Sequence, residues 1–207
     1  APVAWITVSP NIIVVHPSFP ATTVKELIDL AKANPDKYSS AAPGQGSTPH
    51  MAGELFKRAA GIAIVHVPYK GSGPALNDVI GGHIPIMFDG IPSAMPHIRA
   101  GRLRALGVTS LQRVPTAPDI PTVAETLPGF EANGWFALFA PAGTPTEIVN
   151  KLNAEVNRIL DQPDVKQRYA GLGAITVGGP PEKLRDQVKA EVERWGELIR
   201  ATQMKVE

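Results

Sequence analysis

A Gly-rich stretch ahead of a helix holds the groups with the clearest potential for chemistry. The stretch runs from Gly44 through Gly46 and Ser47 to Thr48, and Pro49 suits the first turn of a helix because its missing N–H group would be unpaired there. We expect Thr48 to be the N-cap of this helix. Free backbone N–H groups at a helix N-terminus attract anions, so the stretch predicts a site for phosphate or carboxylate.

The Gly-rich stretch matches none of the glycine motifs that have a dedicated chemistry. It lacks the third glycine of a dinucleotide-binding fingerprint, because position 49 is proline, and no Lys-Ser or Lys-Thr pair follows as in an NTP-binding loop. Ser47 directly follows Gly46, so the stretch is not the nucleophile elbow of a hydrolase. A small-anion site and a plain tight turn into a helix stay equal alternatives.

Two further loops carry polar side chains after expected strands. Tyr69 and Lys70 follow one strand, and Asp89 follows another. For Tyr69, a wall of the binding cleft is favoured over a place in the core. Lys70 either pairs with a carboxylate or is a solvated surface lysine. Asp89 either selects an amino or hydroxyl group of a ligand or caps the helix near Pro92. Because ligands of open α/β sheets bind beyond the carboxyl ends of strands, the three loops predict one common site.

The histidines give weaker signals. His50 lies in the first turn of the helix after the Gly-rich stretch and could donate a hydrogen bond to a ligand, although a capping or packing role is favoured. His50 and Glu54 have the i, i+4 spacing of metal ligands, but two ligands without a third do not predict a metal site. The remaining histidines, including His66, have structural interpretations only. No cofactor is predicted.

Composition excludes several classes of protein. The 207 residues include 20 basic and 19 acidic side chains, so the net charge of +1 does not indicate a nucleic-acid surface. The chain has no cysteine, which excludes thiol catalysis and disulfides. A hydrophobic content of 43% is enough for a substantial core, and no apolar run approaches membrane-spanning length. The start at Ala1 indicates a processed chain or a fragment.

Strands are expected to alternate with helices along the whole chain, which indicates an α/β fold with mainly parallel sheets. Capping-box spacing at Thr23 and Thr122 marks two helix starts, and Gly61 ends the helix that follows the Gly-rich stretch. Expected strands cover residues 3–15 in two pieces, 62–68, 84–88, 103–109, 135–140 and 175–177. The apolar stripes expected to face the core are Met51, Leu55 and Ala59; Ile148, Leu152, Val156 and Ile159; and Leu184, Val188, Val192, Trp195 and Ile199.

Taken together, several segments resemble the substrate-binding proteins of tripartite tricarboxylate transporters, also called Bug proteins. The matching segments are YSSAAPGQGSTPHMAGELF, VHVPYKGSGPALNDVIGGHIPIMFDGIPSAMPHIRAGRLRALGVTS and PTVAETLPGFEANGWFALFAPAGTP. The resemblance implies a two-lobed fold of the type II periplasmic-binding-protein class with a ligand cleft. It also implies a periplasmic protein that captures a small carboxylate for the subunits of a membrane transporter. Gly44, Gly46, Ser47 and Thr48 would hold the carboxylate through backbone N–H groups and hydroxyls.

The resemblance also implies that the first lobe is incomplete. Family members begin with a signal peptide and a first-lobe segment that has no counterpart in this sequence. The proline-rich residues 113–121 then suggest a boundary, with 1–128 as the second, ligand-binding lobe and 129–207 as the C-terminal part of the first lobe. Apolar surface left uncovered on that part predicts self-association.

Two other classes of function compete with solute binding. A hydrolytic enzyme would use Ser47, His50 and Asp89, but Ser47 and His50 lie within one turn, and a Ser47 that caps a helix is not a free nucleophile. The effector-binding lobe of a transcription regulator can share the fold, but no helix-turn-helix segment or basic recognition stretch is present. We therefore expect a binding protein without enzymatic activity and without a nucleic-acid partner.

Overall fold

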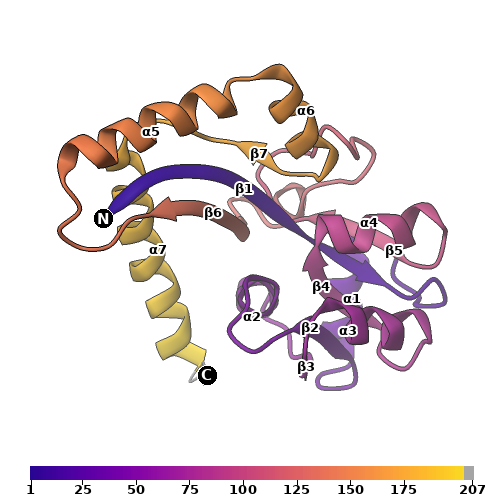
Figure 1. The fold of residues 1–207 in the computed structure, drawn as a ribbon. Coiled ribbons are helices and arrows are strands. Elements are labelled where there is room, and N and C mark those ends of the chain that lie inside the picture. Colours follow the sequence, from indigo (N-terminus) through magenta and orange to yellow (C-terminus); the bar gives the residue numbers. More distant parts are fainter. Residues whose placement is uncertain (203–207) are drawn as a thin grey trace. The chain divides into compact units, whose positions relative to one another are not determined.

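The computed structural model describes residues 1–202, which form two units. Of the described residues, 10–133 form the central unit, and 1–9 together with 134–202 form the flanking unit. Strand β1 (Pro2–Val15) is continuous and contributes its first part to the flanking unit and its second part to the central unit (Figure 1). The break expected at Pro10 is therefore no gap in the strand, but it coincides with the change of unit.

The central unit is built on a five-stranded path in the order β3-β2-β4-β1-β5. The strands are β2 (Ser39–Pro43), β3 (Val65–Tyr69), β4 (Ile86–Gly90) and β5 (Arg104–Val108). Strand β2 pairs in parallel with β3 and β4, whereas β1 pairs antiparallel with β4 and β5. The α/β class is as expected, but the sheet is mixed, because β1 comes from the flanking unit and runs against its neighbours.

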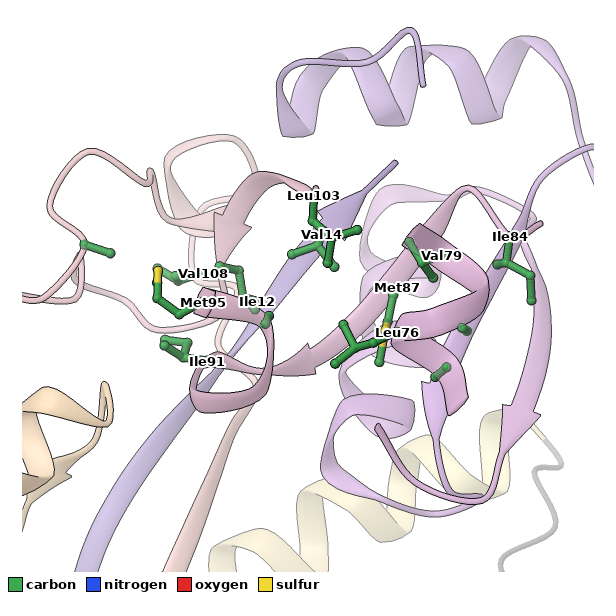
Figure 2. Packing of buried hydrophobic residues seen from close by; sticks show 14 of the residues in the cluster. Ile12, Val14, Leu76, Val79, Ile84, Met87, Ile91, Met95, Leu103 and Val108 are labelled. Carbon is green, nitrogen blue, oxygen red and sulfur yellow. The ribbon is translucent and has the colours of Figure 1, made fainter. Parts of the chain in front are cut away.

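Helices α2 (Thr48–Ala60) and α3 (Ser72–Ile80) cover opposite faces of this sheet. Successive strand residues point to opposite faces. Phe88 of β4 lies beside Phe56 of α2, with 5.6 Å between the ring centroids. The preceding residue, Met87, belongs to a buried cluster with Leu76 and Val79 of α3 (Figure 2). The helices therefore bury the two sides of one strand and hold its carboxyl end in place.

The remaining helices of the central unit are α1 (Val24–Ala33), α4 (Ile91–Arg99) and the 3-10 turn η1 (Val123–Glu125). Both expected capping boxes are confirmed, at Thr23 with Glu26 and at Thr122 with Glu125. Gly61 ends α2 with the left-handed φ of 62°, as expected. The expected stripe of α2 is only partly correct: Met51 is buried, but Leu55 is half-buried and Ala59 is exposed. The other buried residues are His50, Ala52, Phe56 and Ala60, because the sheet lies against the adjacent face of the helix.

In the flanking unit, β6 (Asn133–Phe139) and the two-residue strand β7 (Ile175–Thr176) pair with β1. Its helices are α5 (Thr146–Leu160), α6 (Pro163–Gly171) and, within the described residues, α7 (Pro181–Thr202). A small core joins Val3, Ala4 and Val149. The division expected near residue 128 differs from these units in two respects. The units change between residues 133 and 134, and residues 1–9 lie with the C-terminal segment, because their strand pairs with β7. Whether the units are the two lobes of a longer protein stays a proposal.

Large apolar side chains of the flanking unit are exposed. Val149 and Leu160 are the buried residues of α5. Of the stripe expected to face the core, Val156 is partly buried against the small core, whereas Ile148, Leu152 and Ile159 are exposed. The exposed set comprises Phe136, Phe139, Ile148, Leu152, Ile159, Leu172, Ile175 and Val192. Val192, expected in the buried face of α7, is 70% exposed. Among the helices of residues 1–202, none combines the length and the apolar character needed to cross a membrane.

Candidate functional site

Three strands end at the same edge of the central sheet, and each is followed by a helix. Because β2 is parallel to both β3 and β4, their carboxyl ends lie on one side. Strand β2 leads to α2, β3 to α3 and β4 to α4 (Figure 1). The three loops expected to form a common site are therefore brought together, and we call them the carboxyl-end loops. This edge also collects the positive ends of three helix dipoles.

The Gly-rich loop uses most of its backbone N–H groups internally. The N–H group of Gly44 donates to the carbonyl oxygen of Tyr69 at 2.7 Å, and that of Ser47 donates to the carbonyl oxygen of Gly44 at 3.3 Å. The N–H group of Gly46 donates to Nδ1 of His50 at 2.9 Å. The φ angles of Gly44 (+91°) and Gly46 (+72°) explain the need for glycine. The expectation of free N–H groups at these three positions is therefore wrong, because neighbouring acceptors occupy them.

Ser47, and not Thr48, is the N-cap of α2. Its Oγ accepts a hydrogen bond from the N–H group of His50 and donates one to the carbonyl oxygen of Gly44 at 2.8 Å. Thr48 is instead the first residue of the helix, where it is half-buried. The cap moves by one residue because the turn at Gly46 points the Ser47 hydroxyl at the helix backbone. No acidic side chain lies in the first turn of α2, so its positive end is not neutralised from within the helix.

His50 is buried beneath the Gly-rich loop, with 4% of its surface exposed. Its ring stacks on that of His66 in β3, with 3.8 Å between the centroids and 19° between the planes. Its Nε2 lies 3.7 Å from Oε1 of Glu54, and the same oxygen is 2.6 Å from Nζ of Lys57. The buried position favours the packing role over ligand contact, as the sequence had suggested.

Burial and the neighbouring side chains shift the pKa values of His66 and Glu54. Burial lowers the pKa of the His66 imidazole to about 4, and the neighbouring His50 acts in the same direction. Burial raises the pKa of Glu54, but hydrogen bonds from His50 and Lys57 outweigh this effect and hold the pKa below its usual range. Glu54 is therefore charged and His66 neutral near pH 7.

His66 brings a third potential metal ligand to His50 and Glu54, a role that the sequence did not indicate. Their ligand atoms all lie within 4.8 Å of one another. The geometry nevertheless does not suit a metal ion. The lone pair of an imidazole nitrogen lies in the ring plane, and two stacked rings cannot both direct one at the same ion. In addition, Nδ1 of His50 accepts from Gly46, so the proton of the neutral ring is on Nε2, the atom nearest Glu54.

Asp89 forms the second polar centre of the edge. It is 1% exposed, and its two carboxylate oxygens accept hydrogen bonds from Ser72 Oγ at 2.7 Å and Ser93 Oγ at 2.6 Å. Burial raises its pKa, and the bonds from the two serines oppose this shift. The N-cap of α4 is Gly90, with no side-chain cap, so Asp89 does not cap that helix as one alternative proposed. It instead links the first turns of α3 and α4.

Ser72 and Ser93 were missed by the sequence reasoning. The signal was present: each serine lies in the first helical turn after a strand, in the stretches Lys70-Gly-Ser-Gly-Pro and Asp89-Gly-Ile-Pro-Ser. Which carboxylate the two serines would reach depended on the pairing order of the strands, which local spacing does not specify.

Tyr69 and Lys70 have separate environments at the end of β3. The ring of Tyr69 packs against the core cluster, and its hydroxyl donates to Oδ2 of Asp78 at 2.5 Å. Burial and this carboxylate raise the pKa of Tyr69 to about 12. The expected wall of a binding site is thus at least partly a core residue. Lys70 is exposed and, within residues 1–202, forms no ion pair.

The residues proposed for hydrolysis do not form a catalytic set. Nδ1 of His50 faces Gly46 and its Nε2 faces Glu54, so neither ring nitrogen contacts the Ser47 hydroxyl. The oxygens of Asp89 are bonded to Ser72 and Ser93 and not to His50. In a catalytic set, the nucleophile would have to contact the base, and the base would have to contact the orienting acid.

Comparison with known proteins matches residues 1–204 to the tripartite tricarboxylate transporter family receptor (TctC). The "UPF0065 protein in tcbD-tcbE intergenic region" of a Pseudomonas species is 43% identical over 96% of this chain and 60% of its own length. Protein BugT of Bordetella pertussis is 36% identical over 99% of this chain and 63% of its own length. The chain thus spans about 60% of the length of these curated relatives.

Solved structures give the same match. Rpa4515 of R. palustris with adipate is 38% identical, with a TM-score of 0.89 over 98% of this chain and 68% of the other. The periplasmic binding protein BugD is 35% identical, with a TM-score of 0.84 over 100% and 70%. MatC (Rpa3494) from Rhodopseudomonas palustris with bound malate is 35% identical, with a TM-score of 0.82 over 96% and 69%. These neighbours confirm the periplasmic-binding-protein type of α/β fold.

Proposed function

The chain belongs to the tripartite tricarboxylate transporter receptor family, and from this premise we propose that it captures a small organic carboxylate in the periplasm for the subunits of a membrane transporter. Membership confirms the resemblance inferred from the sequence. The family consists of periplasmic solute-binding proteins, which are not enzymes. The hydrolytic and regulatory alternatives are therefore set aside.

The observation that carries this proposal is the convergence of three helix N-termini at the carboxyl-end loops. The N-termini of α3 and α4 already lie beside a carboxylate of the protein itself, that of Asp89. Asp89 accepts hydrogen bonds from the first turns of α3 and α4, so its carboxylate compensates the positive ends of these helices. The N-terminus of α2 has no acidic residue in its first turn. A second carboxylate is therefore attracted to α2 and repelled from the neighbourhood of Asp89.

Lys70 supplies the matching positive charge in this proposal. Gly44 is bonded to the carbonyl oxygen of Tyr69, which places the Gly-rich loop directly beside the residue that precedes Lys70. The exposed ammonium group of Lys70 is without an ion pair among the described residues, so a ligand carboxylate would be its partner. We assign the ligand contacts to Thr48 and Lys70, and we assign to Gly44, Gly46 and Ser47 the shape of the loop.

Two proteins of similar structure support the class of ligand. One was solved with adipate and the other with malate, which are both small dicarboxylates. A dicarboxylate has a second charged end that this edge does not neutralise, so further contacts would come from elsewhere in the complete protein.

Calorimetry with adipate, malate and a tricarboxylate tests the proposal on the wild type and on Lys70→Gln. A hydrogen bond to a charged group contributes about 1.5–3 kcal/mol, and 1.4 kcal/mol is a factor of ten, so we expect Lys70→Gln to weaken carboxylate binding about tenfold. Lys32→Gln is the matched control, because Lys32 is an exposed lysine in the last turn of α1, which precedes the amino end of β2. Equal affinities of all three proteins would show that the carboxylate binds elsewhere.

We also propose that copies of this chain associate through the exposed apolar side chains of the flanking unit. Phe136 and Val192 are 66% and 70% exposed, values that leave large apolar areas in contact with water. Burial of such side chains contributes about 25 cal/mol for each Å² removed from water, which favours contact between copies.

A further inference from the structure

We propose that His50 is a positioning residue for the Gly-rich loop, in which its Nδ1 atom acts as a hydrogen-bond acceptor that holds Gly46 in place. This inference rests on the proposed function in one respect, namely that the loop it positions lies at the carboxylate site. It assigns to His50 a role that excludes direct contact with the ligand through Nδ1, because that atom already accepts from Gly46 at 2.9 Å.

His50 contacts the loop at two successive residues. Its side chain accepts from the N–H group of Gly46, and its own backbone N–H group donates to Oγ of Ser47. One residue of α2 therefore couples the left-handed turn at Gly46 to the cap of the helix. Gly46 adopts a φ of +72°, and the loop has no apolar side chain that could hold this turn by packing.

The ring of His50 is itself held from two sides. His66 of β3 stacks on one face at 3.8 Å, and Glu54 lies 3.7 Å from the opposite ring nitrogen, Nε2. Lys57 fixes the Glu54 carboxylate at 2.6 Å. An imidazole nitrogen that accepts a hydrogen bond carries no proton, so the neutral ring must carry its proton on Nε2, toward the carboxylate. The arrangement selects one tautomer of His50.

A second proton on His50 would break this arrangement. It would be added to Nδ1, where it would face the N–H group of Gly46 as a second donor. The titratable groups that face the ring are Glu54 and Lys57 on α2 and His66 on β3. His66 stays neutral above about pH 4, because burial lowers its pKa to about 4.

Two substitutions separate the acceptor from the bulk of the ring. In His50→Asn, the side-chain oxygen takes nearly the place of Nδ1 and can accept from Gly46 at all pH values. In His50→Leu, the volume is similar but no acceptor remains. His83→Asn is the control, because His83 is an exposed histidine in the turn after α3. Each variant is made in the 207-residue chain.

Two readouts do not depend on any ligand. Nitrogen-15 NMR of the wild type should show the His50 ring protonated on Nε2 near pH 7. Hydrogen exchange of the Gly46 amide should be slow in the wild type and in His50→Asn, and faster in His50→Leu. Loss of one neutral hydrogen bond corresponds to about two- to tenfold faster exchange. A proton on Nδ1, or equal Gly46 exchange in the wild type and His50→Leu, would overturn the proposal, and the wild-type NMR result holds even if a variant does not fold.

The third readout is the affinity for adipate and malate near pH 7, compared among the wild type, His50→Asn, His50→Leu and His83→Asn. We expect His50→Leu to bind these dicarboxylates more weakly, because it has no acceptor for the Gly46 N–H group, and we expect His50→Asn and His83→Asn to bind them as the wild type does. Wild-type affinity in a folded His50→Leu contradicts the positioning role. If neither dicarboxylate binds the wild type, the proposed function fails, and the tautomer and the Gly46 exchange still decide the role of His50.

Discussion

Replacement of Ser72 by alanine tests whether the buried carboxylate of Asp89 depends on the hydroxyls that reach it from two helices. Asp89 is 1% exposed and accepts one hydrogen bond from Ser72 and one from Ser93. A hydrogen bond to a charged group contributes about 1.5–3 kcal/mol. Ser72 is half-buried, so water can reach its side of the carboxylate. We therefore expect Ser72→Ala to lower the free energy of unfolding of the central unit by about 1.5 kcal/mol near pH 7.

The loss should depend on pH in a defined direction. Burial raises the pKa of Asp89 in the folded state above its unfolded value of about 3.9. Between these two pKa values the native state binds more protons than the unfolded state, so stability increases as the pH falls. Ser72→Ala removes a donor to the charged form and raises the folded pKa further. The deficit of the variant should therefore be largest near neutral pH and shrink as Asp89 becomes protonated in acid.

Urea unfolding followed by circular dichroism measures this deficit. The three tryptophans, Trp5, Trp135 and Trp195, all lie in the flanking unit, so their fluorescence would not report on Asp89. Ser72→Thr keeps the hydroxyl and serves as the control. In an Asp89→Asn background the effect of Ser72→Ala should largely disappear, because the charge is gone. A loss that is the same at neutral and acid pH, or that persists in the Asp89→Asn background, would refute the reasoning.

Two further predictions concern His66 and the flanking unit. Because burial lowers the pKa of His66 from 6.5 to about 4, the unfolded state binds its proton first, and stability should decline as the pH falls from about 6.5 to about 4. The full pKa shift corresponds to about 3 kcal/mol of stability, and the partial exposure of His66 reduces the expected loss to about 1–2 kcal/mol. Urea unfolding of His66→Gln tests this, and an unfolding free energy that depends on pH as it does in the wild type would contradict the prediction. For the flanking unit, light scattering should give a mass that rises with concentration and falls in Ile148→Glu, a site that is 50% exposed, whereas a monomer at all concentrations would exclude self-association.

Features set by neighbouring residues could be predicted from the sequence. The capping boxes at Thr23 and Thr122 and the left-handed end of α2 at Gly61 depend on spacings of a few residues, and all three are present. The convergence of the loops at Gly44, Tyr69 and Asp89 was also predictable, because it needs only that their strands be parallel.

Features set by distant residues could not be predicted in the same way. The antiparallel direction of β1 depends on its course through the flanking unit, which no local pattern reveals. Ile148, Leu152 and Ile159 of α5 are exposed although their spacing is that of a buried face, because periodicity shows only that a face is apolar and not what covers it. The bond between Gly46 and His50 depends on a ring orientation that stacking on His66 fixes from another strand.

The occupied N–H groups of the Gly-rich loop change how the loop can recognise an anion. A loop whose amides point freely outward would have to become ordered around its ligand, and that ordering would reduce the affinity. Here Gly44, Gly46 and Ser47 are already bonded to Tyr69, His50 and one another, so the turn exists before binding. In the proposed function, attraction would then come from the uncompensated end of α2, and selectivity would come from side chains such as Lys70. The prolines at positions 43 and 49 fit this rigid turn. Proline has no N–H group to donate, and the hydrogen bonds that hold the loop are donated by other residues.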